Sequence, residues 1–306
     1  MRDGTAGLPL GLLSAATFGS SGTFAAALFQ AGWTPGAAVI IRVSLAASLL
    51  TVPALLQLRG RWRQLVTAAP GVAVFGLGAV GLAQLSFFNA VQRIPVGVAL
   101  MLEYLGTVLV VVWMWARHGQ RPRRLTVGGA AIAFVGLSLV LDLAGAHRLD
   151  PVGVLWGLCA AVGLATYFVI SAGRADTVPP LVLAWAGLGV GALALIALAA
   201  LGALRIHAPL VPVTLAGHAV SWIVPILGLA VVAAVIPYVA GIAAARRLGA
   251  RLASFVGLFE VLAAVGIAWM LLGQAPAAVQ LAGGALIIAG VALIRVDERP
   301  RAVATA

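Results

Sequence analysis

The chain is poor in charged residues, and this shortage excludes most soluble folds. Only 9% of its 306 residues are charged and 63% are hydrophobic, whereas soluble domains carry roughly 25% charged and 45–50% apolar residues. Lysine is absent, so the net charge of +11 comes from arginine alone. So few polar side chains could not cover a surface in water, and the composition therefore predicts a chain embedded in lipid.

Cysteine and histidine are scarce as well. Cys159 is the only cysteine, which excludes a disulfide framework and a cysteine-based metal site. The four histidines lie in loops or at the ends of apolar stretches, without the spacing of metal ligands. We therefore expect no metal and no cofactor. An enzyme within the membrane, the rival class to a transporter, would need a nucleophile and a base at one depth, and the sequence offers no such pair.

The long apolar stretches predict ten transmembrane helices. A helix needs about 20 apolar residues to cross roughly 30 Å of hydrocarbon, and ten stretches are about that long or longer. The predicted fold class is therefore all-α, a polytopic membrane protein. The predicted spans lie near residues 7–29, 36–58, 67–91, 94–116, 125–143, 152–172, 179–203, 220–245, 250–272 and 276–295.

The arginines are distributed unevenly among the predicted loops. Fifteen flank one set of loops, and only Arg93, Arg148 and Arg205 flank the opposite set. Basic residues favour the cytoplasmic side of a membrane, so both termini and the 117–124 loop are predicted to be cytoplasmic in a bacterial-type inner (plasma) membrane. Short arginine clusters between apolar stretches set topology, and they argue against binding to nucleic acid.

The second half of the chain repeats motifs of the first half in the same order. Leu102-Glu103-Tyr104-Leu105 corresponds to Phe259-Glu260-Val261-Leu262, and Gly119-Gln120-Arg121-Pro122 corresponds to Gly273-Gln274-Ala275-Pro276. Chance similarity between helices rich in alanine, glycine and leucine is the alternative explanation. The conserved order of the motifs favours an internal repeat.

The repeat divides the chain into two halves of five spans each, residues 1–146 and 147–306. Because five is an odd number, the second half would enter the membrane from the opposite side. Inverted repeats of this kind place a substrate site near the midplane between the halves, and two mirror-related conformations then give alternating access.

Several motifs add a resemblance to a known family. They are Phe18-Gly19-Ser20-Ser21, Thr34-Pro35 followed by Arg42, the run 94–104, and the run 247–251 followed by Glu260 and Gly273-Gln274. Together they resemble the EamA-type transporters of the drug/metabolite transporter superfamily, and the run 94–104 is similar to the fourth span of amino-acid exporters in that family. The resemblance implies export of small metabolites such as amino acids. Efflux of amphipathic drugs or organic cations is the alternative.

Three charged residues lie well inside the predicted spans, where ionisable groups are costly and mark function by default. Glu103 lies about 14 Å from the outer end of its helix at about 1.5 Å per residue. Glu260 lies at a similar depth from the cytoplasmic side, so the repeat predicts a quasi-symmetric pair. Each glutamate could bind a proton or a substrate amine, and Arg42 could bind a substrate carboxylate or Glu103. Hydrogen bonds between helices, and snorkelling of Arg42, are the structural alternatives.

The predicted partners of the protein are a small-molecule substrate, the lipid bilayer and a coupling proton. Polar and aromatic residues complete the predicted substrate site. Gln84 and Phe88 share a helical face at four-residue spacing, although helix–helix packing explains them equally well. Pro225 and Pro237 predict kinks in the eighth span, which serve either as a gate or as static bends. The remaining candidates for the walls of the site are Tyr104, Tyr167, Trp185 and Tyr238. The sequence leaves the oligomeric state open.

Overall fold

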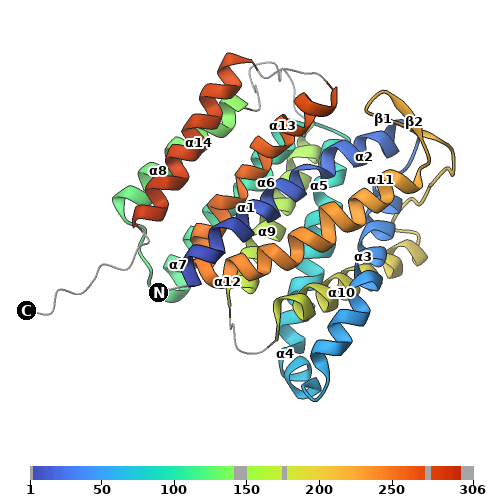
Figure 1. Ribbon diagram of the computed structural model, residues 1–306, viewed down its shortest axis with the longest axis horizontal. Coiled ribbons are helices and arrows are strands. Elements are labelled where there is room, and N and C mark those ends of the chain that lie inside the picture. The colour runs from blue at the N-terminus through green and yellow to red at the C-terminus, as the bar shows by residue number, and fades with distance from the viewer. Residues whose placement is uncertain (1–2, 95, 141–149, 174–177, 273–276, 298–306) are drawn as a thin grey trace, which may run out of the picture.

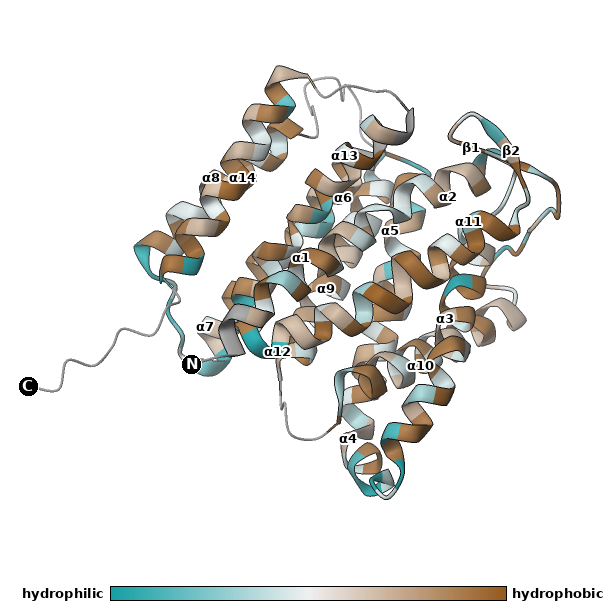
Figure 2. Ribbon diagram, viewed as in Figure 1, coloured by the Kyte–Doolittle hydropathy of each residue, from teal (hydrophilic) through white to brown (hydrophobic). Residues whose placement is uncertain are grey.

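The computed structural model describes residues 3–94, 96–140, 150–173, 178–272 and 277–297. Within these residues the chain is almost entirely helical, apart from connections and one antiparallel hairpin of β1 (Val213–Leu215) and β2 (His218–Val220). The protein is thus an all-α polytopic membrane protein. Figure 2 shows hydrophobic residues along the whole length of the helices and hydrophilic residues mainly at their ends, as lipid requires.

Figure 1 shows how the helices are arranged in space. Among the described residues, two π-helical segments, η1 and η3, lie between α-helices along the chain. The elements of the first half are α1 (Asp3–Gly19), α2 (Ser21–Gln30), α3 (Pro35–Leu58), α4 (Trp62–Val74), η1 (Phe75–Leu82), α5 (Ala83–Val91), α6 (Val96–Tyr104), α7 (Gly106–His118) and α8 (Arg124–Val140). Those of the second half are α9 (Pro151–Ala172), α10 (Pro180–Ala200), the hairpin, α11 (Ile223–Leu227), η3 (Gly228–Val235), α12 (Ile236–Gly257), α13 (Phe259–Leu272) and α14 (Ala278–Asp297).

Eight helical runs among the described residues are long and apolar enough to cross a membrane. They are Ala6–Gln30, Pro35–Leu58, Trp62–Val91, Val98–His118, Pro151–Ala172, Pro180–Ala200, Ile223–Gly257 and Ala278–Asp297. The predicted span 125–143 corresponds to the shorter helix α8, and its residues 141–143 lie outside the described residues, as does the motif 273–276.

The predicted spans 220–245 and 250–272 differ most from the structure. One helical run, Ile223–Gly257, covers the first and enters the second, and α13 continues it. Gly249 interrupts this run with φ of 79° and ψ of 159°. That backbone conformation favours glycine because it has no Cβ, and it separates the two predicted spans without a loop.

Besides the interruption at Gly249, three helix breaks lie within the described part of the bundle, at Ser20 between α1 and α2, at Leu105 between α6 and α7, and at Leu258 between α12 and α13. The Leu258 break lies 153 residues after the Leu105 break, and η3 begins 153 residues after η1. π-Helical segments are rare and occur often at functional sites. The Leu105 break and η1 of the first half therefore recur at a constant distance in the second half.

Helices α8 and α14 form a closely packed pair at one side of the bundle (Figure 1). A Cβ atom on Gly129 would lie 2.7 Å from the carbonyl oxygen of Gly290, and one on Gly136 would lie 2.5 Å from that of Gly283. Glycine allows this approach of two backbones. Asp297 at the end of α14 accepts from the amide (3.2 Å) and the hydroxyl (2.6 Å) of Thr126, so it caps the start of α8.

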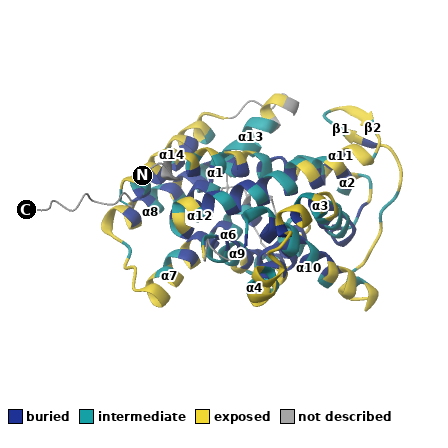
Figure 3. Cartoon of the chain, turned by 60° about the horizontal axis from the view of Figure 1, so that its bottom comes forward, coloured by how far each residue is buried: buried dark blue, intermediate teal, exposed yellow. Residues whose placement is uncertain are grey.

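The other helices surround a buried centre. Helix α1 packs against α12 and α13, α9 packs against α5, α6 and α7, and α3 packs against α10. Figure 3 shows buried residues through the middle of the bundle, between α1, α12, α6 and α9. The connection before the hairpin covers the ends of α2 and α3, because Trp33 donates to the carbonyl of Pro209 (2.9 Å) and the Thr34 amide to that of His207 (2.9 Å).

Candidate functional site

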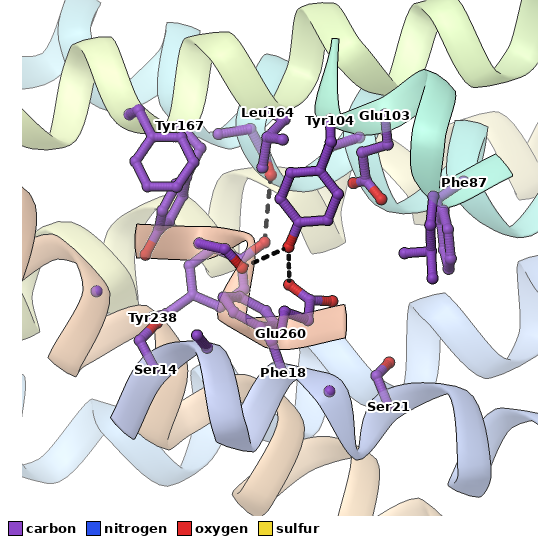
Figure 4. A pocket seen from close by; sticks show the side chains of 18 of the residues that line it. Ser14, Phe18, Ser21, Phe87, Glu103, Tyr104, Leu164, Tyr167, Tyr238 and Glu260 are labelled. Carbon is purple, nitrogen blue, oxygen red and sulfur yellow. Dashed lines mark hydrogen bonds between the residues drawn. The ribbon is translucent and has the colours of Figure 1, made fainter. Parts of the chain in front are cut away.

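A cavity of about 140 Å³ lies at the centre of the bundle. Seven of the side chains that the sequence singled out line it, and they come from six different helices. Figure 4 shows Glu103, Tyr104 and Glu260 pointing into the same space. The seven residues are Arg42, Gln84, Glu103, Tyr104, Tyr167, Tyr238 and Glu260.

Arg42 is buried, with 1% of its surface exposed, and connects α3 to three other segments. Its Nη1 donates to Ser21 Oγ (3.1 Å) and to Gln84 Oε1 (2.7 Å), and its Nη2 donates to the carbonyl of Ala233 in η3. Pro237, four residues on, has no amide hydrogen and cannot donate to that carbonyl in the α-helical register. Pro237, predicted as a gate or a static bend, thus lies beside the site.

Arg42 retains unused capacity to bind an anion. Its Nε is buried and has no hydrogen-bond partner among the described residues. Glu103 and Glu260 attract it electrostatically, yet no ion pair within 4.0 Å joins it to either glutamate in the part of the chain that the structure describes. A desolvated cation without a close counter-ion is costly in a membrane, and an anionic ligand would stabilise it.

Tyr238 extends the network of Arg42 across the cavity. Gln84 Nε2 donates to Tyr238 Oη (3.3 Å), and that hydroxyl donates to the carbonyl of Ala79 in η1 (3.2 Å). On the same side, Ser14 Oγ donates to the carbonyl of Pro237 (2.8 Å). Both π-helical segments therefore present a backbone carbonyl to a side chain that lines the cavity.

Tyr104 lies against the Leu258 break. Its Oη is 2.8 Å from the carbonyl oxygen of Gly257 and 2.8 Å from Glu260 Oε2 (Figure 4). The Gly257 carbonyl is open to a donor from another helix because the amide of Val261 donates to Leu258, three residues back instead of four (3.1 Å). One phenol hydroxyl thus connects a freed carbonyl and a buried carboxyl group.

The Leu105 break is closed locally. The amide of Val108 donates to Leu105 (3.0 Å), and the freed carbonyl of Tyr104 accepts from the Thr107 hydroxyl of the same helix (2.8 Å). Thr107 follows its break by two residues, as Glu260 follows the Leu258 break. Thr107, which no sequence motif indicated, therefore occupies the position that corresponds to Glu260.

Glu103 lies two residues before the Leu105 break, so its counterpart is Val256 and not Glu260. The motif match paired residues 157 apart, whereas the breaks are 153 apart. Measured from the two breaks, the expected quasi-symmetric pair of glutamates is therefore out of register by four residues, about one helical turn. Both glutamates still line one cavity, but only Glu260 has a side-chain hydrogen bond among the described residues.

Four predicted residues lie outside the cavity lining, Pro237 among them. Phe88 packs edge-to-face on Phe29, with ring centroids 5.5 Å apart. Trp185 donates to Thr51 Oγ1 of α3 (3.0 Å) and lines a separate pocket beside α4. Pro225 is buried in α11.

The structure adds lining residues that the sequence did not indicate. Phe87 lines the cavity in place of Phe88, and Phe18 packs on Tyr238 with ring centroids 5.4 Å apart. The cavity thus combines one guanidinium, two carboxyl groups and phenol hydroxyls with aromatic walls. Such a site suits a small molecule that is mostly apolar and carries a few polar groups.

Comparisons with known proteins agree with this architecture. The model of the EamA-like transporter family matches residues 5–142 and residues 151–296. An uncharacterized transporter of Archaeoglobus fulgidus is 27% identical over 222 residues, which make up 72% of this chain and 73% of that protein. A solved crystal structure has the same fold, with a TM-score of 0.76 at 20% identity over 96% of this chain and 99% of that chain. The chain belongs to the EamA-like transporter family of the drug/metabolite transporter superfamily, and it is a multi-pass membrane transporter.

Proposed function

We propose that the protein exports small metabolites, amino acids or related zwitterions, by alternating access around the central cavity. The observation that carries this proposal is the presence of both charge signs in one desolvated space. Arg42 offers an unused Nε to a carboxylate, and Glu103, without a side-chain hydrogen bond among the described residues, offers an acceptor to an amine. Charge-assisted hydrogen bonds of this kind are strong in a site with little water.

Alternating access rests on ten spans in two inverted halves, residues 1–146 and 147–306. The constant distance of 153 residues between the two breaks and between η1 and η3 supports this arrangement. The reciprocal glycine contacts of α8 and α14 support it too, since a two-fold axis between those helices would exchange them. Membership of a transporter family favours movement of the substrate without covalent chemistry.

We place both termini in the cytoplasm of a bacterial-type cell, with the protein in the inner membrane. The start of α1, the end of α14 and the connection between α7 and α8 lie at one end of the molecule in Figure 1, and the hairpin lies at the other. Arginines gather at the first end, which favours the cytoplasm. Reporter fusions at residues 120 and 147 should report opposite sides, and a shared side contradicts the topology.

Flux measurements test the proposed substrate class. Purified protein in proteoliposomes should move labelled amino acids with apolar side chains, leucine among them, faster than cationic dyes. Arg42→Gln should lower amino-acid flux, because the amide cannot provide the charge-assisted hydrogen bond. Trp185→Phe, outside the cavity, serves as the control. Wild-type vesicles that move no zwitterion contradict the proposal.

Efflux of amphipathic cations is the second candidate, and the excess of carboxyl groups over guanidinium groups in the cavity favours it. A cation needs no partner for its other end, so this function does not require Arg42. Dye transport that survives Arg42→Gln, together with no amino-acid flux, favours this candidate over the first.

A further inference from the structure

We propose that Glu260 carries the proton that drives transport, and that Tyr104 links the protonation of Glu260 to the shape of the Leu258 break. This inference rests on the proposed transport function and names the coupling ion and its binding group. The geometry that points to it is the pair of 2.8 Å contacts that Tyr104 Oη makes with Gly257 and Glu260.

The number of hydrogens around Tyr104 decides how these contacts are made. A phenol hydroxyl has one hydrogen to donate, and a backbone carbonyl can only accept. If Tyr104 donates to Gly257, its contact with Glu260 is a hydrogen bond only when Glu260 is protonated and donates to the phenol oxygen. With Glu260 protonated, Tyr104 Oη, the Gly257 carbonyl oxygen and Glu260 Oε2 are therefore all hydrogen-bonded at the same time.

An ionised Glu260 leaves one of these groups without a partner. A carboxylate only accepts, so Tyr104 must turn either to Glu260 or to Gly257, and it abandons the other. The abandoned group is buried, and leaving it unsatisfied is unfavourable. Loss of the proton thus weakens the contact between α6 and the Leu258 break, whereas the Leu105 break, closed by Thr107, is unaffected.

The surroundings of Glu260 separate its role from that of Glu103. The titratable and charged groups that face the cavity around it come from α3, α6, α9 and α12, while α1 and α2 contribute the hydroxyls of Ser14 and Ser21. Glu103 has no such phenol partner in the described chain, and remains available to a substrate amine. The facing groups are Arg42, Glu103, Tyr104, Tyr167 and Tyr238.

The charge count of the cavity is consistent with this division. With Glu260 protonated, Arg42 and ionised Glu103 leave the empty cavity neutral overall, whereas ionised Glu260 adds a second carboxylate that can attract the amine of a bound zwitterion. In the cycle, only the O–H bond of Glu260 forms and breaks. Its proton comes from water on the outer side as substrate leaves and is released to water on the cytoplasmic side, which makes the protein a proton antiporter.

Infrared spectroscopy of the purified protein tests the proton site without a substrate. A pH titration should show a carboxylic-acid C=O band that disappears as the pH rises. Glu260→Gln should remove this band, and the fold should persist because the amide can donate to Tyr104 as the protonated acid does. Glu103→Gln, the matched control, should retain it. A band that survives Glu260→Gln, or is lost only in Glu103→Gln, overturns the proposal.

Tyr104→Phe keeps the test decisive if Glu260→Gln does not fold. This variant retains the carboxyl group but removes its partner, so the band should shift to higher frequency. An unchanged band contradicts the link between the two residues.

Flux of labelled leucine tests the coupling. We expect the ratio of flux with a pH gradient to flux without one to fall to unity in Glu260→Gln and to persist in Glu103→Gln, although total flux is lower. A ratio above unity in Glu260→Gln refutes the coupling role. Wild-type vesicles that move no zwitterion, but still show the band, would refute the transport proposal and leave the proton site intact.

Discussion

The Leu105 and Leu258 breaks have the same backbone pattern but different partners. In each, the amide three residues after the break donates to the carbonyl of the break residue and leaves the preceding carbonyl free. At Leu105, Thr107 of the same helix satisfies that carbonyl, whereas at Leu258 the donor is Tyr104 of another helix. One break is therefore complete within its own helix, and the other depends on how two helices are placed.

This difference shows how two halves with similar backbones can have different roles in transport. A break that closes on itself can act as a fixed bend. A break that needs a partner from across the cavity responds when that partner moves, and here the partner also contacts the carboxyl group of Glu260. The two halves can thus share a backbone while only one of them senses a proton.

The largest expected effect tests whether the two breaks are packed alike. A Cβ on Gly19 would lie 2.6 Å from the Glu260 carbonyl, and one on Gly106 would lie 2.6 Å from that of Ala161. Valine at either position should therefore destabilise the fold by about 3 kcal/mol, as overpacking does. Thermal unfolding in detergent measures this loss. Gly266→Ala, which has open space around it, is the control. Early melting of only one variant would show that the packing differs.

The next effect concerns Glu103, which lies before the Leu105 break, whereas Glu260 lies after the Leu258 break. Glu103→Gln should lower zwitterion flux by about ten- to 150-fold, because a hydrogen bond to a charged group contributes about 1.5–3 kcal/mol. Thermal stability should be unchanged, since Glu103 has no side-chain hydrogen bond among the described residues. Flux assays and melting curves of the same preparation measure both quantities. Wild-type flux would remove Glu103 from the binding site.

The sequence predicted the apolar spans and the cavity-lining charges, because length, hydropathy and depth follow from residue type alone. It did not predict the breaks, whose positions depend on contacts such as that of Gly106 with α9. The motif match therefore paired the glutamates one turn out of register. The choice of Phe88 over Phe87 failed similarly: positions three and four residues after Gln84 share its face, and only the packed bundle selects between them.

A smaller effect distinguishes the two breaks directly. Tyr104→Phe and Thr107→Val each leave a carbonyl without its donor, so each should cost about 1–2 kcal/mol of stability. Only Tyr104→Phe should also change the pH dependence of leucine flux. Melting curves and flux between pH 6 and 8, roughly the physiological range, measure both. An altered pH profile in Thr107→Val would mean that the Leu105 break is also sensitive to protons.

The smallest effect is expected for a variant outside the cavity, which serves as the reference for the other variants. Trp185→Phe removes one hydrogen bond to Thr51 outside the cavity. We expect a loss of about 0.5–1 kcal/mol in stability, typical of a single hydrogen bond, and unchanged flux. A strong loss of flux would show that the transport path extends beyond the central cavity.

The pairing of α8 with α14 has a consequence for the synthesis of the chain. The glycine surface that fits that of α8 belongs to α14, the last helix among the described residues, and the carboxylate that caps the first turn of α8 is Asp297. Helix α8 therefore stays without its partner until more than 150 further residues, α14 among them, have been synthesised. A chain released before α14 would leave α8 in the membrane without its partner helix, and exposed unpaired helices of this kind are expected to be recognised by membrane quality control.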